Sequence, residues 1–176
     1  MNGKSAEPLA LHFADDGSVP NNPTLPMLLY RGGIDLSGTA DPEAVIENAF
    51  KANGWGHGVW RNGIYPYVHY HSRIHEALAI ARGRAKVRFG GNQGEEIDIG
   101  VGDVALLPAG TGHQCLWHSP DLLVIGAYPP DGAYDLCRGS KSDHARAVVS
   151  IPKVPLPTTD PVYGQDGPLK RLWLTR

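Results

Sequence analysis

Four potential metal ligands stand at fixed distances from a set of glycines and one proline, and this pattern limits the folds open to the chain. The first stretch reads Gly63-x5-His69-x-His71-x4-Glu76-x6-Gly83. The second reads Gly102-x5-Pro108-x-Gly110-x2-His113. Three imidazoles and one carboxylate form a suitable inner shell for a divalent transition metal. A metal that takes five or six ligands keeps positions open for water, oxygen or substrate.

The residue types around these ligands predict β-strands. Residues 67–71 are β-branched and aromatic, and alternate side chains of a strand share a face, so His69 and His71 point the same way. A second predicted strand covers residues 76–81 and begins with Glu76. Its carboxylate can therefore return to a metal that the two histidines hold.

Residues that alternate with a ligand along a strand are candidates to line a ligand pocket. One such strand begins with Glu76 and another begins with His113. The candidates on these two strands are Leu78, Ile80, Cys115 and Trp117. We expect the indole of Trp117 to face inward, where a flat ring would favour planar or apolar ligands over bulky sugars.

The two stretches resemble the motifs of the cupin superfamily, which read G-x5-H-x-H-x3-4-E-x6-G and G-x5-P-x-G-x2-H-x3-N. The first motif is matched at every specified position. The second is matched through His113, but Trp117 stands where the family has Asn. Residues 84–101 separate the motifs, which is within the usual range. The segments before and after the motifs further resemble a small bacterial cupin group of unassigned function.

The resemblance implies an all-β fold, the double-stranded β-helix or jelly-roll barrel, with one divalent transition metal per chain. The implied ligands are His69, His71, Glu76 and His113. Iron, manganese, nickel, zinc, cobalt and copper all suit such a set, so the pattern leaves the metal open. The superfamily includes oxygenases, isomerases, epimerases, sugar-binding sensors and seed storage proteins, so it leaves the reaction open too.

The chain of 176 residues predicts one structural domain with three parts. Residues 1–54 form an arm and a short helix, which Asp41 caps and Pro42 begins. Residues 55–128 form the barrel core with both motifs. Residues 129–176 are rich in proline and predict an irregular extension, although a tryptophan near the end indicates that it docks on the barrel.

Charge and hydropathy exclude several partners. The net charge of −2 provides no basic surface for nucleic acid. No run of about 18 apolar residues predicts a membrane span. The first residues lack the apolar core of a secretory signal, and two cysteines do not make a disulfide framework, so we expect a cytoplasmic protein.

Three further features bear on assembly and on the surroundings of the site. The apolar segment Met27 to Tyr30 follows a proline-rich arm, and we expect it to pair across the subunit boundary of a homodimer. We expect His75 to point away from the face of Glu76. It is either a structural or solvent-exposed histidine, or a residue at the rim that acts as an acid or base or as an alternative ligand. Trp60 either packs in a strand or lines the rim.

The sequence therefore predicts a metal-binding cupin that takes a small-molecule ligand. A metal-dependent enzyme of dioxygenase or isomerase type is the first hypothesis. A ligand-binding or sensing protein without turnover is the alternative, and a structural cupin is the third. Burying four polar side chains without a metal would cost several kcal/mol, about 1–3 for each unsatisfied group, which disfavours the structural role.

Overall fold

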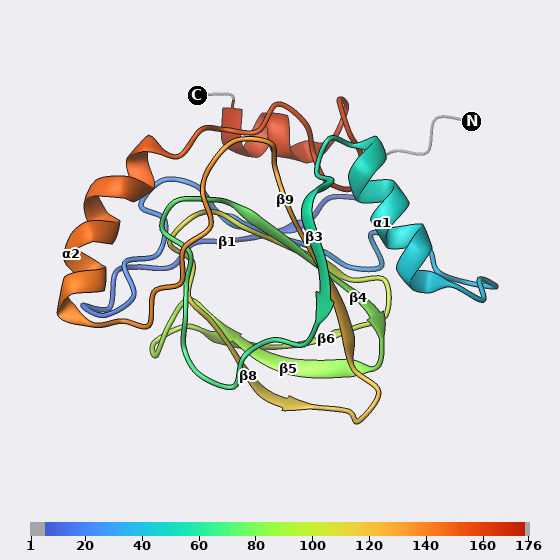
Figure 1. Cartoon of the computed structure of the whole chain (residues 1–176), viewed down its shortest axis with the longest axis horizontal. Coiled ribbons are helices and arrows are strands. Elements are labelled where there is room, and N and C mark those ends of the chain that lie inside the picture. Colours follow the sequence, from blue (N-terminus) through green and yellow to red (C-terminus); the bar gives the residue numbers. More distant parts are fainter. Residues whose placement is uncertain (1–5, 175–176) are drawn as a thin grey trace.

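Nine strands form two antiparallel sheets in the computed structural model, which describes residues 6–174 (Figure 1). The larger sheet contains, in spatial order, β1 (Leu9–Leu11), β2 (Met27–Tyr30), β7 (Val104–Leu107), β4 (Glu76–Arg82), β9 (Leu123–Tyr128) and β3 (His57–Asn62). The smaller sheet contains β6 (Glu95–Gly100), β5 (Arg84–Phe89) and β8 (His113–His118). Neighbours in the larger sheet are mostly distant in sequence, as a jelly roll requires.

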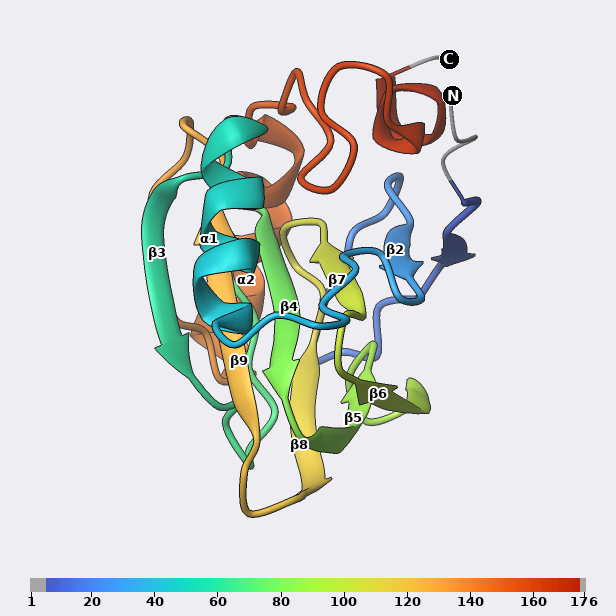
Figure 2. The same ribbon diagram turned by 90° about the vertical axis from the view of Figure 1, so that its right-hand side faces the viewer.

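The central strand β4 explains how the layers are arranged. Its outward side chains are the small residues Ala77, Ala79 and Ala81. Its inward side chains are Glu76, Leu78 and Ile80. The small outward residues let helix α1 (Pro42–Ala52) lie close against the sheet (Figure 2). Ile46 and Phe50 of this helix are fully buried.

Helix α1 begins where the sequence indicates. The side chain of Asp41 accepts a hydrogen bond from the backbone N–H of Ala44, and Pro42 is the first helical residue. The helix ends before Gly54, whose positive φ of 80° suits glycine.

The two sheets face each other across a hydrophobic core that both of them supply. Leu78 and Val124 from the larger sheet pack with Val87, Phe89 and Cys115 from the smaller one. The expected double-stranded β-helix is confirmed, although the described strands form two separate sheets rather than one closed barrel. The predicted strand at residues 67–71 is reduced to single bridges, in which His69 pairs with His113 and Tyr70 with Cys137.

The C-terminal extension is more regular than its composition indicates. The structure has helix α2 (Lys141–Ser150), the 3-10 turn η1 (Ile151–Lys153) and the π-helical turn η2 (Lys170–Leu174). The prediction of an irregular tail is wrong because prolines stop at residue 130 and resume at 152, which leaves room for α2 between them. Its Ser140 caps the helix through the N–H of Asp143. As expected, Trp173 is buried and donates to the carbonyl of Pro26.

Both hydrogen-bonding edges of the apolar strand β2 are paired within its own chain. It pairs with β1 on one side and with β7 on the other. The expected pairing of Met27–Tyr30 across a subunit boundary is therefore wrong, because both of its edges are already hydrogen-bonded. Of the helices in the described part of the chain, none has the length and apolar character that a membrane span requires.

Candidate metal centre

Backbone hydrogen bonds bring the predicted ligands together from distant parts of the chain. The N–H and carbonyl groups of His69 and His113 bond reciprocally, with N···O distances of 3.2 and 2.9 Å. Gly110, in the turn before His113, donates its N–H to the carbonyl of His71 at 2.7 Å. Glu76 enters from the first position of β4. The glycine and proline of the second motif thus form a turn that fastens the two histidine segments to each other.

The three histidines form a compact cluster of nitrogen donors. One ring nitrogen from each of His69, His71 and His113 lies within 4.8 Å of the other two, and all three side chains are buried. The ring centroids of His69 and His113 are 4.0 Å apart. Such a cluster of imidazoles, reached from one cavity, is suited to hold a metal ion.

Each imidazole is fixed in the tautomer that a metal ligand needs. The Nδ1 atoms of His69, His71 and His113 lie 3.0, 2.5 and 3.0 Å from the backbone carbonyls of Tyr67, Asp135 and Thr111. A carbonyl can only accept, so the proton belongs on Nδ1 and the lone pair of Nε2 is left for a metal. Partners of this kind orient the ring and raise its basicity as a ligand.

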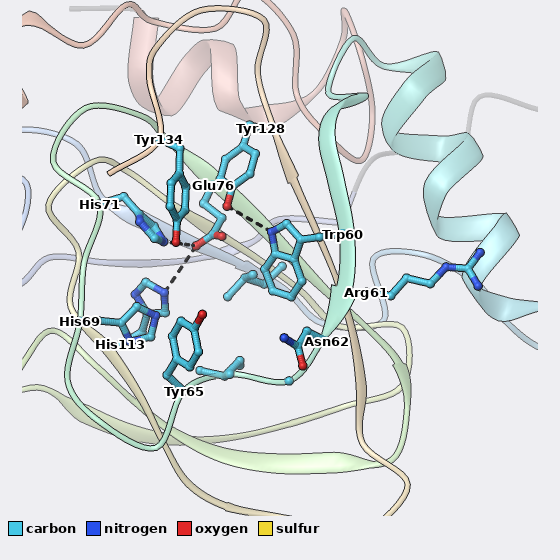
Figure 3. A pocket seen from close by; sticks show the side chains of 13 residues that line it. Trp60, Arg61, Asn62, Tyr65, His69, His71, Glu76, His113, Tyr128 and Tyr134 are labelled. Carbon is cyan, nitrogen blue, oxygen red and sulfur yellow. Dashed lines mark hydrogen bonds and ion pairs between the residues drawn. The ribbon is translucent and has the colours of Figure 1, made fainter. Parts of the chain in front are cut away.

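Glu76 lies against two of the three histidines. Its Oε2 is 3.2 Å from Nε2 of His71 and 3.4 Å from Nε2 of His113 (Figure 3). These are electrostatic contacts without hydrogen-bond geometry, because Oε2 has no hydrogen-bond partner among the described residues and is buried. A buried carboxylate oxygen without a partner, facing two imidazole nitrogens, fits a metal ligand. The residues present therefore suit a divalent ion.

The protonation states of the cluster follow from burial and mutual charge. Burial lowers the pKa of His69 to about 3, and the neighbouring His113 acts in the same direction. Burial also opposes charge on His71, but the carboxylate of Glu76 raises its pKa above the usual 6.5. Burial would raise the pKa of Glu76, yet the charge of His71 and contact with His113 hold it below its usual value. Each of these two groups therefore favours the charged form of the other.

The cluster stands at one side of a cavity of about 220 Å³ (Figure 3). The lining residues are Trp60, Arg61, Asn62, Gly63, Ile64, Tyr65, His69, His71, Glu76, Leu78, His113, Tyr128 and Tyr134. Figure 3 shows that the guanidinium of Arg61 points away from the cluster, and this group pairs with Glu47 at 2.6 Å. Aromatic and aliphatic side chains therefore dominate the space beside the metal ligands, with the amide of Asn62 as a neutral polar group.

Tyr128 and Tyr134 supply hydroxyl groups that stay protonated. Burial raises the pKa of Tyr128, and the charge of Glu76 raises it further. Trp60 donates its indole N–H to the hydroxyl oxygen of Tyr128 at 3.1 Å, so the hydroxyl proton is left for another acceptor. Burial also raises the pKa of Tyr134, whose ring lies 5.1 Å from that of His71.

Asp135 ties the loop that carries Tyr134 to the metal site. Its backbone carbonyl holds Nδ1 of His71, and its carboxylate accepts from the N–H and the hydroxyl of Ser72 at 2.8 and 2.6 Å. Cys137 Sγ is also within 3.4 Å of this carboxylate. One residue therefore sets both the orientation of a metal ligand and the position of a cavity wall.

The four pocket candidates from the sequence lie in different places. Leu78 lines the cavity, whereas Ile80 and Cys115 pack in the core between the sheets. The prediction that Trp117 faces inward is wrong, because 51% of it is exposed. Its indole lies under the guanidinium of Arg84, 5.4 Å from the ring centre to Cζ.

A β-bulge in β8 explains the reversed face of Trp117. Cys115 pairs with Val87 and Trp117 pairs with Lys86, so Leu116 is an extra residue opposite the β5 backbone. An inserted residue shifts the alternation by one position. Trp117 therefore points outward, although it stands two residues from the buried Cys115.

His75 faces away from the metal cluster, as its place beside Glu76 predicts, and it is 1% exposed. It is a structural histidine at this position, since its Nδ1 accepts the N–H of Ala109 at 2.9 Å. Nothing in the two motifs indicates Tyr128, Tyr134 or Asp135. They follow the second motif at distances that no motif specifies. Tyr128 ends β9, and the fold of the loop after β9 brings Tyr134 to the cavity.

The two motifs and the two facing sheets are those of a cupin, and the three buried histidines could hold a metal ion. No family model matches the chain. The chain is 38% identical over 162 residues to a protein named "Uncharacterized protein YjlB" from Bacillus subtilis (strain 168), covering 92% of this chain and 94% of that protein. The chain belongs to the family of YjlB.

The chain is also similar to several solved structures at low identity. An uncharacterized protein with a double-stranded β-helix domain from Klebsiella pneumoniae has a TM-score of 0.38, is 13% identical and covers 80% of this chain and 91% of that chain. An acireductone dioxygenase from Bacillus anthracis, with cadmium in its active centre, has a TM-score of 0.39, is 15% identical and covers 58% of this chain and 70% of that chain. At these scores the similarity says nothing about activity.

Proposed function

We propose that this protein is a metal-dependent enzyme that acts on a small organic molecule. The observation that carries the proposal is the set of three Nε2 atoms, each freed by a hydrogen bond at Nδ1 and all beside a ligand-sized cavity. A site that served only to stabilise the fold would have no need of a cavity next to its ligands. His69, His71, His113 and Glu76 would hold one divalent ion.

The cavity restricts the size and character of the substrate. Its volume of 220 Å³ lies below the roughly 300–1,000 Å³ of ordinary ligand pockets, so the substrate is small. Trp60, Tyr65 and Tyr128 provide aromatic walls, which suit a planar molecule. A preference for planar ligands would therefore come from these three aromatic residues and not from Trp117.

The side chains beside the ligands have distinct tasks. The hydroxyl of Tyr128 accepts from Trp60 and can donate its own proton to a substrate oxygen in the cavity. Tyr134 covers the site next to His71 and keeps bulk water from one side of it. A raised pKa keeps both hydroxyls as donors at neutral pH, so neither acts as a base there.

A bound ion would supply either oxygen activation, in an oxygenase, or Lewis-acid polarisation of a carbonyl or water, in an isomerase or hydrolase. Elemental analysis of protein purified without added metal separates these cases. Iron favours the dioxygenase type, and zinc favours isomerisation or hydrolysis.

Turnover is tested by incubating the metal-loaded protein with a small-molecule extract and following the mixture by mass spectrometry. We expect one small compound to be consumed and a product to appear, with no change for the His113→Ala variant. A compound that binds stoichiometrically and is recovered unchanged would instead support the alternative, a binding or sensing cupin.

We also propose that the protein is a homodimer, through a surface other than β2. Light scattering at micromolar concentration tests this, with twice the chain mass of 18.9 kDa as the expected result. A monomeric mass would overturn it.

A further inference from the structure

Strands β3 and β9, at one edge of the larger sheet, are built to place an indole in the metal cavity. The two strands are antiparallel, and Trp60 of β3 pairs directly with Gly126 of β9. A Cβ atom on Gly126 would overlap with Cε2 of Trp60, although the φ of this glycine is not in the left-handed region. Space therefore explains the glycine, since any side chain at this position would displace the indole.

The ring of Tyr128 is accommodated in a similar way. Tyr128 is the last residue of β9, and a Cβ atom on Gly58 of β3 would lie 3.0 Å from its Cδ2. The register of β3 shifts between His57 and Trp60, so this glycine lies in the irregular part of the strand. Each strand thus has a glycine against the aromatic ring of the other, and the two backbones fix how the rings meet.

The hydrogen bond between the two rings has one direction. Nε1 of Trp60 donates to the hydroxyl oxygen of Tyr128 at 3.1 Å, because an indole N–H can only donate. The hydroxyl proton of Tyr128 must therefore point elsewhere. Figure 3 shows this hydroxyl directed toward the space beside Trp60 and Glu76. Burial and the nearby charge of Glu76 both raise the pKa of Tyr128, so the proton is present at neutral pH.

Tyr128 is the best shielded of the three tyrosines in the cavity wall. It is 9% exposed, against 42% for Tyr65 and 55% for Tyr134. A hydrogen bond is stronger where water is excluded. Arg61 pairs with Glu47, so the hydroxyl of Tyr128 is the buried neutral donor that this wall offers to a negative oxygen.

We propose that Trp60 is a positioning residue that aims the hydroxyl proton of Tyr128 at a negatively charged oxygen of the substrate. This rests on the proposed metal-dependent function and adds the substrate class, a small molecule with an anionic oxygen such as an enolate or a phenolate. The carboxylate of Glu76 is the competing acceptor, but a carboxylate that ligates a divalent ion gives up much of its charge to the ion. A phenol that accepts a hydrogen bond is also a better donor, so Trp60 acts through Tyr128.

Ligand binding to the cobalt(II)-loaded protein, followed by visible absorption, tests the proposal without turnover. The two probes are of similar size: acetohydroxamate presents an oxygen anion, whereas the coordinating nitrogen of imidazole has no further lone pair. Tyr128→Phe should weaken acetohydroxamate binding roughly ten- to 100-fold and leave imidazole binding unchanged. Tyr163→Phe removes a hydroxyl from a ring that packs on the outer core and does not line the cavity, so it should bind both probes normally.

A double-variant cycle tests whether Trp60 acts through Tyr128. Trp60→Phe keeps an aromatic ring but removes the N–H, and it should weaken acetohydroxamate binding roughly three- to ten-fold. The double variant Trp60→Phe/Tyr128→Phe should bind no more weakly than Tyr128→Phe alone. Losses that add in the double variant would overturn the positioning role of Trp60.

The glycine opposite Trp60 gives a third variant. Gly126→Ala forces the indole to move and should reproduce the loss of Trp60→Phe. Gly100→Ala is the matched control, because a Cβ atom there meets no atom within 4 Å and the φ of Gly100 is not in the left-handed region. If Gly126→Ala does not fold, the Trp60→Phe cycle decides the question.

Three outcomes would contradict the proposal, and they are distinguishable. Equal acetohydroxamate affinity in Tyr128→Phe and the wild type would overturn this inference and leave the metal site intact. Weaker cobalt binding in Tyr128→Phe, with unchanged affinity for acetohydroxamate, would assign the hydroxyl to Glu76 and overturn it as well. A wild-type protein that shows no cobalt spectrum before any probe is added would overturn the proposed function, and this inference with it.

Discussion

Strands β4 and β8 both begin with a predicted metal ligand, yet alternation assigns the faces of one correctly and misplaces a residue of the other. β4 is central and pairs with both β7 and β9, and its inward and outward residues alternate as far as Ile80. β8 lies at the edge of the smaller sheet and pairs with β5 alone among the described strands. It accommodates a bulge at Leu116. Pairing on both sides fixes the register of β4 as far as Ala79. Beyond it β4 pairs with strand β9 alone and shifts register between Ile80 and Arg82, as β8 shifts where it pairs with β5 alone.

The largest expected effect concerns metal affinity and compares His113, the first residue of β8, with Glu76, the first residue of β4. His113→Ala removes a nitrogen from the three-histidine cluster, so we expect zinc affinity to fall by more than roughly 100-fold, beyond the loss that outer-shell changes cause. Glu76→Gln keeps the three nitrogens and should weaken binding less. Competition with a chelating dye measures both constants. If Glu76→Gln lowered zinc affinity as much as His113→Ala does, the carboxylate would contribute as much to binding as a histidine.

Stability gives the next contrast, on β4. Leu78 is 2% exposed, and Leu78→Ala should lower the free energy of unfolding by about 2–5 kcal/mol, through lost burial and the cavity that remains. Urea unfolding followed by circular dichroism measures it. A loss below about 1 kcal/mol would show that the inner face of β4 is less tightly packed than the structure indicates.

The contact between Glu76 of β4 and His71 in the segment before it predicts a pH effect on metal binding. His71 must be neutral to bind metal, and Glu76 raises its pKa above 6.5, so protons compete with metal into the neutral range. Affinity should therefore rise as pH increases through this pKa. Glu76→Gln removes the charge that raises it, and the rise should move to lower pH. An unshifted profile, measured by titration calorimetry at several pH values, would contradict the pairing.

Trp117 of β8 should show the smallest effect. Its ring is half exposed, and its contact with Arg84 is a surface cation–π interaction worth about 0.5–1 kcal/mol. Trp117→Ala should therefore cost about 1 kcal/mol or less and leave metal affinity unchanged. Urea unfolding and the dye assay check both. A loss near that of Leu78→Ala would mean that the indole is buried and that the bulge is misplaced.

The fold and the ligand cluster could be predicted because local rules determine them. Spaced glycines and a proline mark turns, β-branched residues mark strands, and alternation places His69 and His71 on one face. Asp41 and Pro42 locate the first helix for the same reason. These signals lie within a few residues of the features that they predict.

The cavity walls could not be predicted, because they depend on contacts between distant segments. Tyr128 reaches the metal site from the end of β9, and Tyr134 reaches it through a loop that Asp135 fastens to Ser72, far away in sequence. Leu116 carries no residue signal of a bulge. Helix α2 lies between two groups of prolines, and the prolines by themselves predict an irregular segment.

Metal content is the most direct test of the central claim that the histidine cluster binds one divalent ion. Elemental analysis of wild-type protein and of the His69→Ala/His71→Ala double variant, both saturated with zinc and then desalted, measures it. The account predicts about one zinc per wild-type chain and almost none in the double variant, since two of three nitrogens are gone. Stoichiometric zinc in the double variant, with the fold intact by circular dichroism, would contradict it.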